Sequence, residues 1–348
     1  MHMLPKKWVV FRLSALGDIV LTTGVLRHWH EMYGWRFQVL TKEAFAPVFD
    51  NNPMVDGVIT AEAANLAMPR MGAWFAELAR RYKDYGLLDL HGTLRSALLA
   101  ALWKGPVRRY AKHGFARRAF LLSGGRVYKE TLRSLTVPQR YALAVAKTAP
   151  PAGELLPSLY LTDAERMRAK SFLANLFRDG VLKNTFDPLS RCVALHPFAA
   201  HAHKAWPGDR YKELVREFEK KGIPWVALGQ GEALFPGDPR DLTGKTTLRE
   251  SAALLAACSV LVSGDSGPMH LATAVGTPVI GLFGPTTREW GFFPSGPRDR
   301  VLESDMPCRP CSLHGRKQCP HGGECLGRID AAAVLAALEE VWPETTAP

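Results

Sequence analysis

The most informative residues of this chain surround Asp265, in the segment Ser263-Gly-Asp-Ser-Gly-Pro-Met-His270. An apolar run ends at Asp265, Gly267 permits a tight turn, and the proline that follows suits the first turn of a helix. Such a turn directs free backbone N–H groups and the positive end of the helix toward the end of the strand, where they can bind an anion. The same residues also fit a purely structural helix cap, with Asp265 and Ser266 capping and His270 satisfied inside the fold.

Gly284-Pro-Thr286 follows the next apolar run and brings a hydroxyl and further backbone amides to the same region. Because neighbouring parallel strands end at one edge of a sheet, this turn and the Asp265 turn should open onto the same space. A single strand-to-helix turn is a common structural feature, whereas two turns that converge favour a bound ligand. The sequence therefore predicts an anion-binding site at this edge.

A carboxylate and an amine follow two other apolar runs. Asp18 comes directly after Gly17 in a turn that lacks the three glycines of a dinucleotide fingerprint and the lysine of a P-loop. Its carboxylate either caps a helix or acts as a general base. Lys204, in the segment Lys204-Ala-Trp-Pro207, suits the neutralisation of a phosphate.

Parallel strands are needed to bring these residues together. Short apolar runs alternate with amphipathic stretches of helical length, a pattern typical of βα units. In the first half, the predicted strands are Trp8–Leu13, Phe37–Thr41, Gly57–Thr60 and Leu87–Leu90, and the predicted helices are 19–33, 65–83, 93–103 and 131–147. In the second half, the predicted strands are Cys192–His196, Trp225–Leu228, Val260–Ser263 and Val279–Phe283, and the predicted helices are Arg166–Phe177, Asp209–Lys221, 248–257, one that begins near Gly267, and Ala331–Val341.

A proline-rich break without periodicity runs from Thr148 to about Pro157. We place the domain boundary there, which predicts two doubly wound α/β domains over residues 1–150 and 151–348. Two such domains that face a central cleft bind ligands outside the carboxyl ends of both sheets.

The composition excludes several classes of protein. Apolar residues make up 47% of the 348 residues and charged residues 22%, which is ordinary for a globular chain and excludes extensive disorder. No apolar run reaches the ~18 residues of a membrane span, and the N-terminal residues lack the apolar region of a signal peptide. We therefore expect a cytoplasmic protein without a transmembrane segment.

Positive charge is concentrated in the first half of the chain. The formal net charge is +11, and residues 95–140 hold eleven Lys and Arg residues and one acid, Glu130. This window favours a polyanionic partner, namely a nucleic acid, an anionic lipid or a phosphorylated substrate, over an unspecialised solvated surface.

Four of the six cysteines form a C-x2-C-x7-C-x5-C pattern between residues 308 and 325. In a cytosolic protein this pattern favours a structural metal site, with zinc ahead of iron, over disulfides. Reduced or disulfide-bonded cysteines remain the alternative. The predicted ligands are Cys308, Cys311, Cys319 and Cys325.

Together these motifs resemble glycosyltransferase family 9, the ADP-heptose:lipopolysaccharide heptosyltransferases. The resemblance spans residues from about 8 to 330, and it departs from the family at His91, where glutamine is more usual, and around Glu232, whose surroundings match poorly. The segments that carry it are Gly17-Asp18, Asp89-Leu-His-Gly-Thr-Leu-Arg95-Ser96, Lys204-Ala-Trp-Pro207, Asp265-Ser-Gly-Pro-Met-His270 and Gly284-Pro-Thr286.

The resemblance implies a GT-B architecture, in which the first domain binds the acceptor and the second binds the nucleotide sugar. It implies metal-independent, inverting transfer, with Asp18 as the general base and Lys204 neutralising the diphosphate leaving group. The implied donor-binding residues are Glu232, Asp265, Ser266, Gly267, His270 and Thr286.

The implied acceptor is an anionic, Kdo-bearing glycolipid at the inner membrane surface, and Arg95, Arg117 and Arg118 are the candidates to bind its anions. Two other functions remain open at this stage. One is a GT-B enzyme that uses another nucleotide sugar, as a transferase or an epimerase. The other is a nucleic-acid-binding protein with a zinc module, although we expect no nucleic acid because this function leaves Asp18 and Lys204 unexplained.

Overall fold

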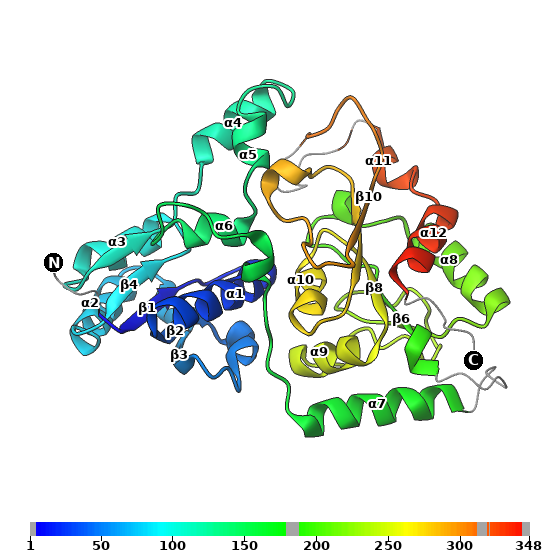
Figure 1. Ribbon diagram of the computed structural model, residues 1–348, viewed down its shortest axis with the longest axis horizontal. Coiled ribbons are helices and arrows are strands. Elements are labelled where there is room, and N and C mark those ends of the chain that lie inside the picture. The colour runs from blue at the N-terminus through cyan, green and yellow to red at the C-terminus, as the bar shows by residue number, and fades with distance from the viewer. Residues whose placement is uncertain (1–4, 179–187, 312–318, 320, 343–348) are drawn as a thin grey trace. The chain divides into compact units, whose positions relative to one another are not determined.

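The computed structural model describes residues 5–178, 188–311, 319 and 321–342. These residues form two compact units, each built around one five-stranded parallel β-sheet (Figure 1). The first unit takes residues 1–113 and 135–160, and the second takes residues 114–134 and 161–348. The predicted α/β class with two Rossmann-like, doubly wound domains is confirmed.

The sheet of the first unit has the strand order β3-β2-β1-β4-β5, and every neighbouring pair is parallel. In the central strand β1, Val9 pairs with Leu87 of β4 and Gln38 of β2. The central strands are almost continuously apolar because helices cover both faces. The strands are β1 (Lys7–Phe11), β2 (Arg36–Lys42), β3 (Val55–Ala61), β4 (Gly86–Asp89) and β5 (Val107–Arg109).

One face of this sheet packs on α2 and α3, where Phe75 and Leu99 meet Val9 and Phe11 in the core. A second helical layer consists of α1 and α6, which pack against each other. The helical elements of this unit are α1 (Leu16–Tyr33), η1 (Glu43–Phe49), η2 (Ala64–Leu66), α2 (Arg70–Arg81), α3 (Leu94–Leu102), α6 (Val137–Ala142) and η3 (Ala152–Leu155).

Residues 135–160 complete the first unit by packing on α1. A Cβ atom added at Gly24 would lie only 2.2 Å from the carbonyl oxygen of Leu155. Thr23 accepts a hydrogen bond from the backbone N–H of Ser158, and Arg27 donates to the carbonyl of Leu156. Helix α1 therefore requires a residue without a side chain at position 24 for this segment to approach.

The sheet of the second unit has the order β10-β9-β8-β6-β7 and is also parallel throughout. Helices α8 and α12 cover one face, where Trp206, Tyr211 and Leu338 lie in the core (Figure 1). The strands are β6 (Val193–His196), β7 (Trp225–Ala227), β8 (Val260–Gly264), β9 (Val279–Phe283) and β10 (Arg300–Glu303).

Helices α9 and α10 form the layer on the other face, and α7 packs against α9. An ion pair between Arg249 and Glu165, 2.6 Å long, joins these two helices. The helical elements are α7 (Asp163–Arg178), η4 (Pro188–Arg191), η5 (Ala202–Lys204), α8 (Gly208–Lys221), α9 (Leu248–Ala257), α10 (Gly267–Ala274), η6 (Arg288–Trp290), α11 (Glu324–Gly327) and α12 (Ala331–Val341).

Residues 114–134, which we call the helical insert, belong to the second unit although they interrupt the first in sequence. The insert contains α4 (Gly114–Leu122) and α5 (Lys129–Arg133). Its buried Phe120 packs edge-on against Trp290 of η6, with ring centroids 5.6 Å apart. This apolar contact attaches the insert to η6 of the second unit.

The structure differs from the sequence predictions in one helix, in the end of the first unit and in several short elements. The predicted helix 131–147 is two helices, α5 and α6, because Thr136 caps a new helix that has Pro138 in its first turn. The first unit extends to residue 160, not 150, and Leu155, Leu156 and Ser158 of this extension contact α1. The short strands β5 and β10 and the helix α4 were not predicted. No helix of the described ranges combines the length and the apolar character needed to cross a membrane.

Candidate functional site

Asp18 is the centre of a hydrogen-bonded group in the first unit that we call the carboxylate cluster: Arg12, Asp18 and Tyr141. Nη2 of Arg12 lies 2.5 Å from Oδ2 of Asp18, and the Tyr141 hydroxyl donates to Oδ1 over 2.7 Å. The backbone N–H of Ala15 donates a longer bond, of 3.4 Å, to Oδ2. Asp18 therefore caps the first turn of α1 and is also fixed by two side chains from other elements.

The charge state of this cluster follows from its burial and its partners. Burial alone would raise the pKa of Asp18, but the charge of Arg12 and the hydrogen bonds from Tyr141 and Ala15 outweigh it and hold the pKa below its ordinary value. Burial raises the pKa of the Tyr141 phenol well above its usual value. At neutral pH the cluster is therefore a carboxylate held between a guanidinium and a neutral hydroxyl donor.

The loop after β4 supports the cluster. Arg12 donates through Nη1 to a backbone carbonyl of this loop. Asp89, which is fully buried, accepts from the backbone N–H groups of His91 and Gly92, at 3.0 and 2.9 Å. It also accepts from Nε of Arg109 at 3.0 Å. The Asp89 motif of the sequence thus shapes the loop that contacts Arg12.

His91 lies half-buried beside Arg12, with its ring 5.6 Å from that of Phe11. Burial and then the charges of Arg12 and Lys112 lower the pKa of His91 to about 4, so the ring is neutral at pH 7. Within the described residues, neither Nδ1 of His91 nor Nε of Arg12 has a hydrogen-bond partner, and both atoms are buried. Burying a polar atom without a partner costs free energy. His91 and Arg12 therefore each offer one atom that could form a further hydrogen bond.

A second group, which we call the lysine cluster, comprises Lys204, Asp265 and Thr286 of the second unit. Nζ of Lys204 lies 2.6 Å from Oδ2 of Asp265, and the Thr286 hydroxyl donates to the same oxygen over 2.8 Å. The backbone of Gly264 approaches Lys204 so closely that an added Cβ would lie 2.6 Å from the Lys204 carbonyl oxygen. The ends of β8 and β9 therefore converge as predicted, and glycine at 264 allows η5 to meet them.

The first turn of α10 follows directly after this cluster. Ser266 is the N-cap residue but makes no side-chain capping bond. Its hydroxyl instead contacts Nδ1 of His196 at 3.2 Å and the Ser263 hydroxyl at 3.0 Å. Because Asp265 is engaged by Lys204 and Thr286, neither predicted capping residue caps the helix in the structure. The helix start keeps the positive end that an anion would use.

The remaining predicted donor residues lie in different surroundings. His270 is buried in α10, with its ring 6.2 Å from that of Phe292. Glu232 is exposed in the turn after β7, where the ring of Phe198 packs against the backbone of Gly229 and Gly231. The structure thus brings Lys204, Asp265, Ser266 and Thr286 together and leaves Glu232 at the surface.

The three predicted acceptor arginines are divided between the units. Arg95 is exposed on α3 of the first unit, whereas Arg117 and Arg118 lie in the helical insert of the second. Arg117 is half-buried and donates to the carbonyl of Trp290 over 3.4 Å, and Arg118 is exposed. The basic window of residues 95–140 is therefore not one surface of one domain.

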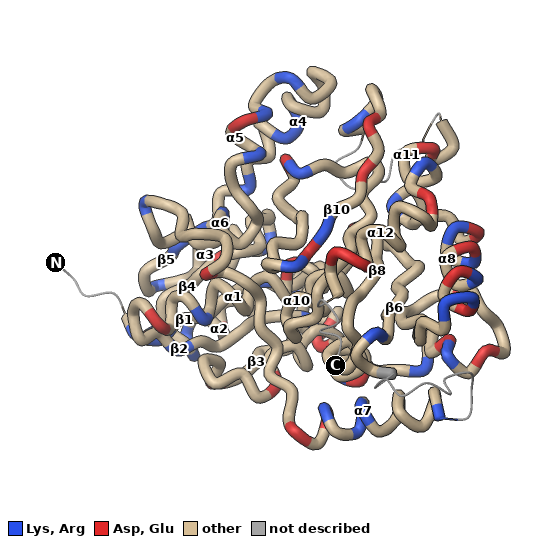
Figure 2. The backbone as a smooth tube through the Cα atoms, turned by 45° about the vertical axis from the view of Figure 1, so that its right-hand side comes forward, with Lys and Arg blue, Asp and Glu red and all other residues tan. Residues whose placement is uncertain are grey.

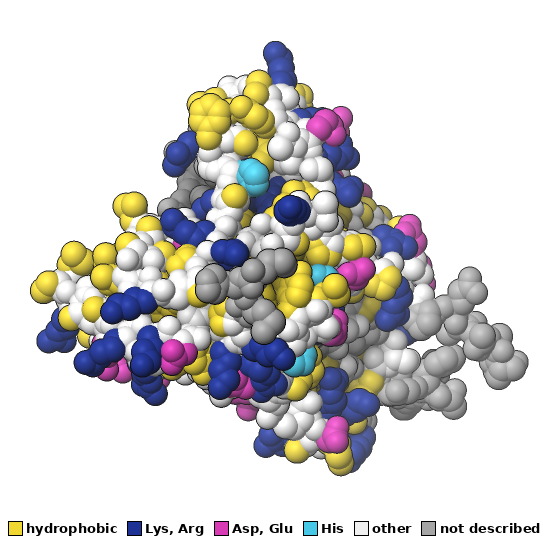
Figure 3. Space-filling view, turned by 60° about the vertical axis from the view of Figure 1, so that its left-hand side comes forward, with side chains coloured by type: hydrophobic (Ala, Val, Ile, Leu, Met, Phe, Trp, Pro, Cys, Tyr) yellow, Lys and Arg dark blue, Asp and Glu magenta, His cyan; other side chains and the backbone are white. Residues whose placement is uncertain are grey.

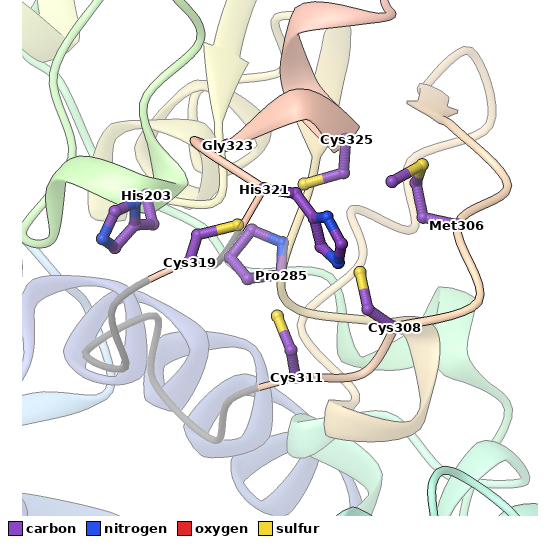
Figure 4. Close-up of a pocket in the computed structure, with 9 residues that line it drawn as sticks. All are labelled: His203, Pro285, Met306, Cys308, Cys311, Cys319, His321, Gly323 and Cys325. Atoms are coloured by element: carbon purple, nitrogen blue, oxygen red, sulfur yellow. The ribbon is translucent and has the colours of Figure 1, made fainter.

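The four cysteines of the predicted metal site line one pocket together with His203 and His321 (Figure 4). Burial, and then the proximity of the other three thiols, raises the pKa of Cys311. The donor set suits zinc or iron. As they stand, however, the His, Cys, Asp and Glu side chains of the described residues include no group of three or more placed to hold a metal ion. The cluster is gathered but is not a preformed coordination site.

Sequence reasoning missed Arg12, Tyr141 and His196. A lysine or arginine directly after an apolar strand is a usable signal, and Arg12 follows β1 in this way. Tyr141 reaches Asp18 from 123 positions away, and no local pattern predicts such a contact.

The chain is similar to known proteins over most of its length. The family model of glycosyltransferase family 9 (heptosyltransferase) matches residues 75–321. Lipooligosaccharide heptosyltransferase 2 of Haemophilus influenzae is 30% identical over 302 residues, which cover 80% of this chain and 83% of that protein. Lipopolysaccharide heptosyltransferase 2 of Escherichia coli is 29% identical over 309 residues, covering 82% and 84%. The solved structure of a family 9 glycosyltransferase from Veillonella parvula has a TM-score of 0.72 at 20% identity, with 98% of both chains covered.

Proposed function

The chain belongs to glycosyltransferase family 9, the heptosyltransferases, and from this premise we propose that it moves a heptose from ADP-heptose to the Kdo/heptose inner core of lipopolysaccharide, with inversion at the sugar. It is a glycosyltransferase with the two Rossmann-like domains of the GT-B architecture. We propose the identity of the donor, the identity of the acceptor and the roles of individual residues.

The observation that carries the proposal is the lysine cluster at the start of α10. A cation and a helix N-terminus without a side-chain cap can bind the diphosphate of a nucleotide sugar and stabilise the charge that develops as it leaves. The diphosphate would compete with Asp265 for Lys204. We assign donor binding to the second unit, with Asp265, Ser266, Gly267 and Thr286 around the diphosphate, and His270 and Glu232 as further contacts.

Asp18 is the proposed general base in the first unit. In the reaction, the acceptor hydroxyl gives its proton to the Asp18 carboxylate while its oxygen forms a bond to C1 of the heptose. The bond between C1 and the β-phosphate oxygen breaks, and ADP leaves with the electron pair. Arg12 and Tyr141 are positioning residues, because they hold the carboxylate in its ionised form and in one orientation.

The test is the release of ADP from ADP-heptose when a Kdo–lipid A acceptor is added. Asp18→Ala should abolish turnover while leaving ADP binding intact, since the proposed donor-binding residues belong to the second unit and Asp18 to the first. Turnover in the Asp18→Ala variant equal to that of the wild type would remove Asp18 from its role. ADP release without acceptor at the same rate would reject the transfer.

The alternative is a GT-B enzyme for another nucleotide sugar, and the exposed position of Glu232 keeps this alternative open. A thermal-shift series with ADP, UDP and GDP separates the two. The proposed function expects the largest rise in Tm with ADP, and a larger rise with UDP or GDP would contradict ADP-heptose as the donor.

We further propose a structural zinc or iron ion held by Cys308, Cys311, Cys319 and Cys325, outside the transfer chemistry. The four thiols around one pocket support it, and binding would require them to draw together. Elemental analysis of purified protein checks the proposal, and a protein free of both zinc and iron would contradict it. We also propose that the protein is cytoplasmic and acts at the membrane surface that carries the lipid-linked acceptor.

A further inference from the structure

The helical insert exposes apolar side chains on the face that does not pack against its own unit. On α4, Ala116 and Phe120 are buried toward Trp290, whereas Phe115 and Leu122 are 76% and 86% exposed. Phe115 and Leu122 are two helical turns apart and so lie on one face of α4. A short helix gains nothing in its own stability from two exposed apolar side chains, so this face is suited to a partner.

The turn after α4 extends the apolar surface. Val127 and Tyr128 are also exposed, and the Tyr128 ring packs edge-on against Phe115 with centroids 6.1 Å apart. In the space-filling view, hydrophobic and basic side chains gather at the top of the molecule, where Figure 1 places this segment (Figure 3). The aromatic pair and Leu122 thus make a compact apolar patch.

The insert is also rich in positive charge. The insert holds five basic residues and a single acid, Glu130 (Figure 2). Arg117 is partly committed to Trp290, but the other four basic side chains are exposed: Arg118, Arg126, Lys129 and Arg133. The insert therefore combines exposed aromatic and aliphatic groups with four exposed cations.

We propose that the helical insert docks this enzyme on an anionic lipid bilayer, with Phe115, Leu122 and Tyr128 entering the interface and the basic residues contacting phosphate headgroups. Aromatic and leucine side chains beside Lys and Arg are the combination that binds such surfaces. A second copy of the insert fits poorly, because it would bring two sets of basic residues together. The proposal deepens the proposed function, since a lipid-linked acceptor lies on such a bilayer.

Vesicle co-sedimentation of the full chain tests the docking without any substrate. The wild type should sediment with vesicles of phosphatidylcholine and phosphatidylglycerol and stay in the supernatant with phosphatidylcholine alone. Arg126→Glu with Lys129→Glu should weaken binding by about fivefold for each positive charge removed. Phe115→Ser with Leu122→Ser should weaken it by at least as much.

A matched control lies on α7, where Met167 and Phe172 are 67% and 45% exposed. Met167→Ser with Phe172→Ser should leave vesicle binding unchanged, and each variant should keep the Tm of the wild type. Equal loss in this control, or equal sedimentation of the wild type with both vesicle types, would overturn the proposal.

ADP release from a soluble, delipidated acceptor separates this proposal from the proposed function. The insert variants should retain that activity, whereas Asp18→Ala should lose it and still bind vesicles. Loss of activity on the soluble acceptor in the Arg126→Glu/Lys129→Glu variant would place the insert in acceptor binding instead and overturn membrane docking.

Discussion

Lys204 and Asp265 form an ion pair, with Nζ and Oδ2 2.6 Å apart, and Asp265 lies directly before Ser266, the N-cap residue of α10. Thr286 donates to the same carboxylate oxygen, so Asp265 is held by two neighbours and in turn orients the lysine. A diphosphate that binds at this turn must replace Asp265 as the partner of the Lys204 ammonium. Substitution of Lys204 and substitution of Asp265 should therefore have different effects.

Removing the cation should impair the departure of ADP. Lys204→Gln is expected to lower kcat on the order of 100-fold, because one preorganised charge at a leaving group contributes that much. Steady-state ADP release measures the effect. Lys212→Gln is the control, since Lys212 lies half-exposed on α8 with an exposed partner. A fall in kcat no larger than that of the control would mean that Lys204 does not meet the leaving group.

Removing the partner should have the opposite effect on binding. Asp265→Asn takes away the negative charge that competes for Lys204, so ADP should bind about fivefold more tightly, corresponding to ~1 kcal/mol. At the same time kcat should fall, because Lys204 loses the group that orients it. Isothermal titration with ADP gives the affinity. Weaker ADP binding in this variant would instead indicate that Asp265 contacts the nucleotide directly.

The carboxylate cluster predicts the pH dependence of transfer. The pKa of Asp18 is held below its ordinary value, so the acid limb of kcat/KM should lie at a lower pH than an aspartate with its ordinary pKa would give. Tyr141→Phe removes a hydrogen bond to the carboxylate, which raises the pKa of Asp18 and moves the acid limb to higher pH. Tyr110→Phe is the control, because the Tyr110 ring packs on the Tyr141 ring, whereas Arg12 and Tyr141 are the side chains that hold Asp18 among the described residues. An acid limb at the same pH in Tyr141→Phe and wild type would contradict the arrangement.

Buried His196 predicts how stability depends on pH. Burial lowers its pKa from 6.5 to about 4, so between these values the unfolded chain binds a proton that the folded chain does not. The protonation of His196 should therefore not affect the free energy of unfolding above pH 6.5. As the pH drops toward 4, it should lower this free energy by on the order of 3 kcal/mol. Denaturant titrations across that range measure it. His196→Gln should flatten the slope, and an unchanged slope would exclude His196 as its source.

The contact between α1 and residues 152–156 predicts a large effect of one methyl group. Gly24→Ala places a Cβ 2.2 Å from the Leu155 carbonyl oxygen and should destabilise the protein by about 2 kcal/mol. Gly72→Ala on α2 is the matched control, because its Cβ would meet no atom within 4 Å, and it should be neutral or stabilising. Thermal unfolding compares them. Equal Tm values for the two variants would mean that the contact is not kept in solution.

Much of the fold could be predicted because it depends on local patterns. Buried parallel strands such as β8 and β9 read as apolar runs, and Gly267-Pro268 marks the start of α10 from its residue types alone. The convergence of Asp265 and Thr286 followed from one rule about strand ends. The motifs also identified the family, which the family model confirms.

The parts that were missed depend on contacts between distant residues. The insert belongs to the second unit because Phe120 meets Trp290, a pairing 170 positions apart that periodicity does not encode. The pairing of Tyr141 with Asp18 is of the same kind. The assignment of Arg117 and Arg118 to the first domain failed for this reason, since sequence position was the only guide to the unit they join.

The chain passes between the two units three times, at 113/114, 134/135 and 160/161. A chimera of two family members with a single junction at 160/161 would combine the insert of one parent with the second unit of the other. Phe120 would then face a foreign partner at the position of Trp290. Replacement of the second unit by that of another family member therefore requires residues 114–134 to be exchanged together with residues 161–348.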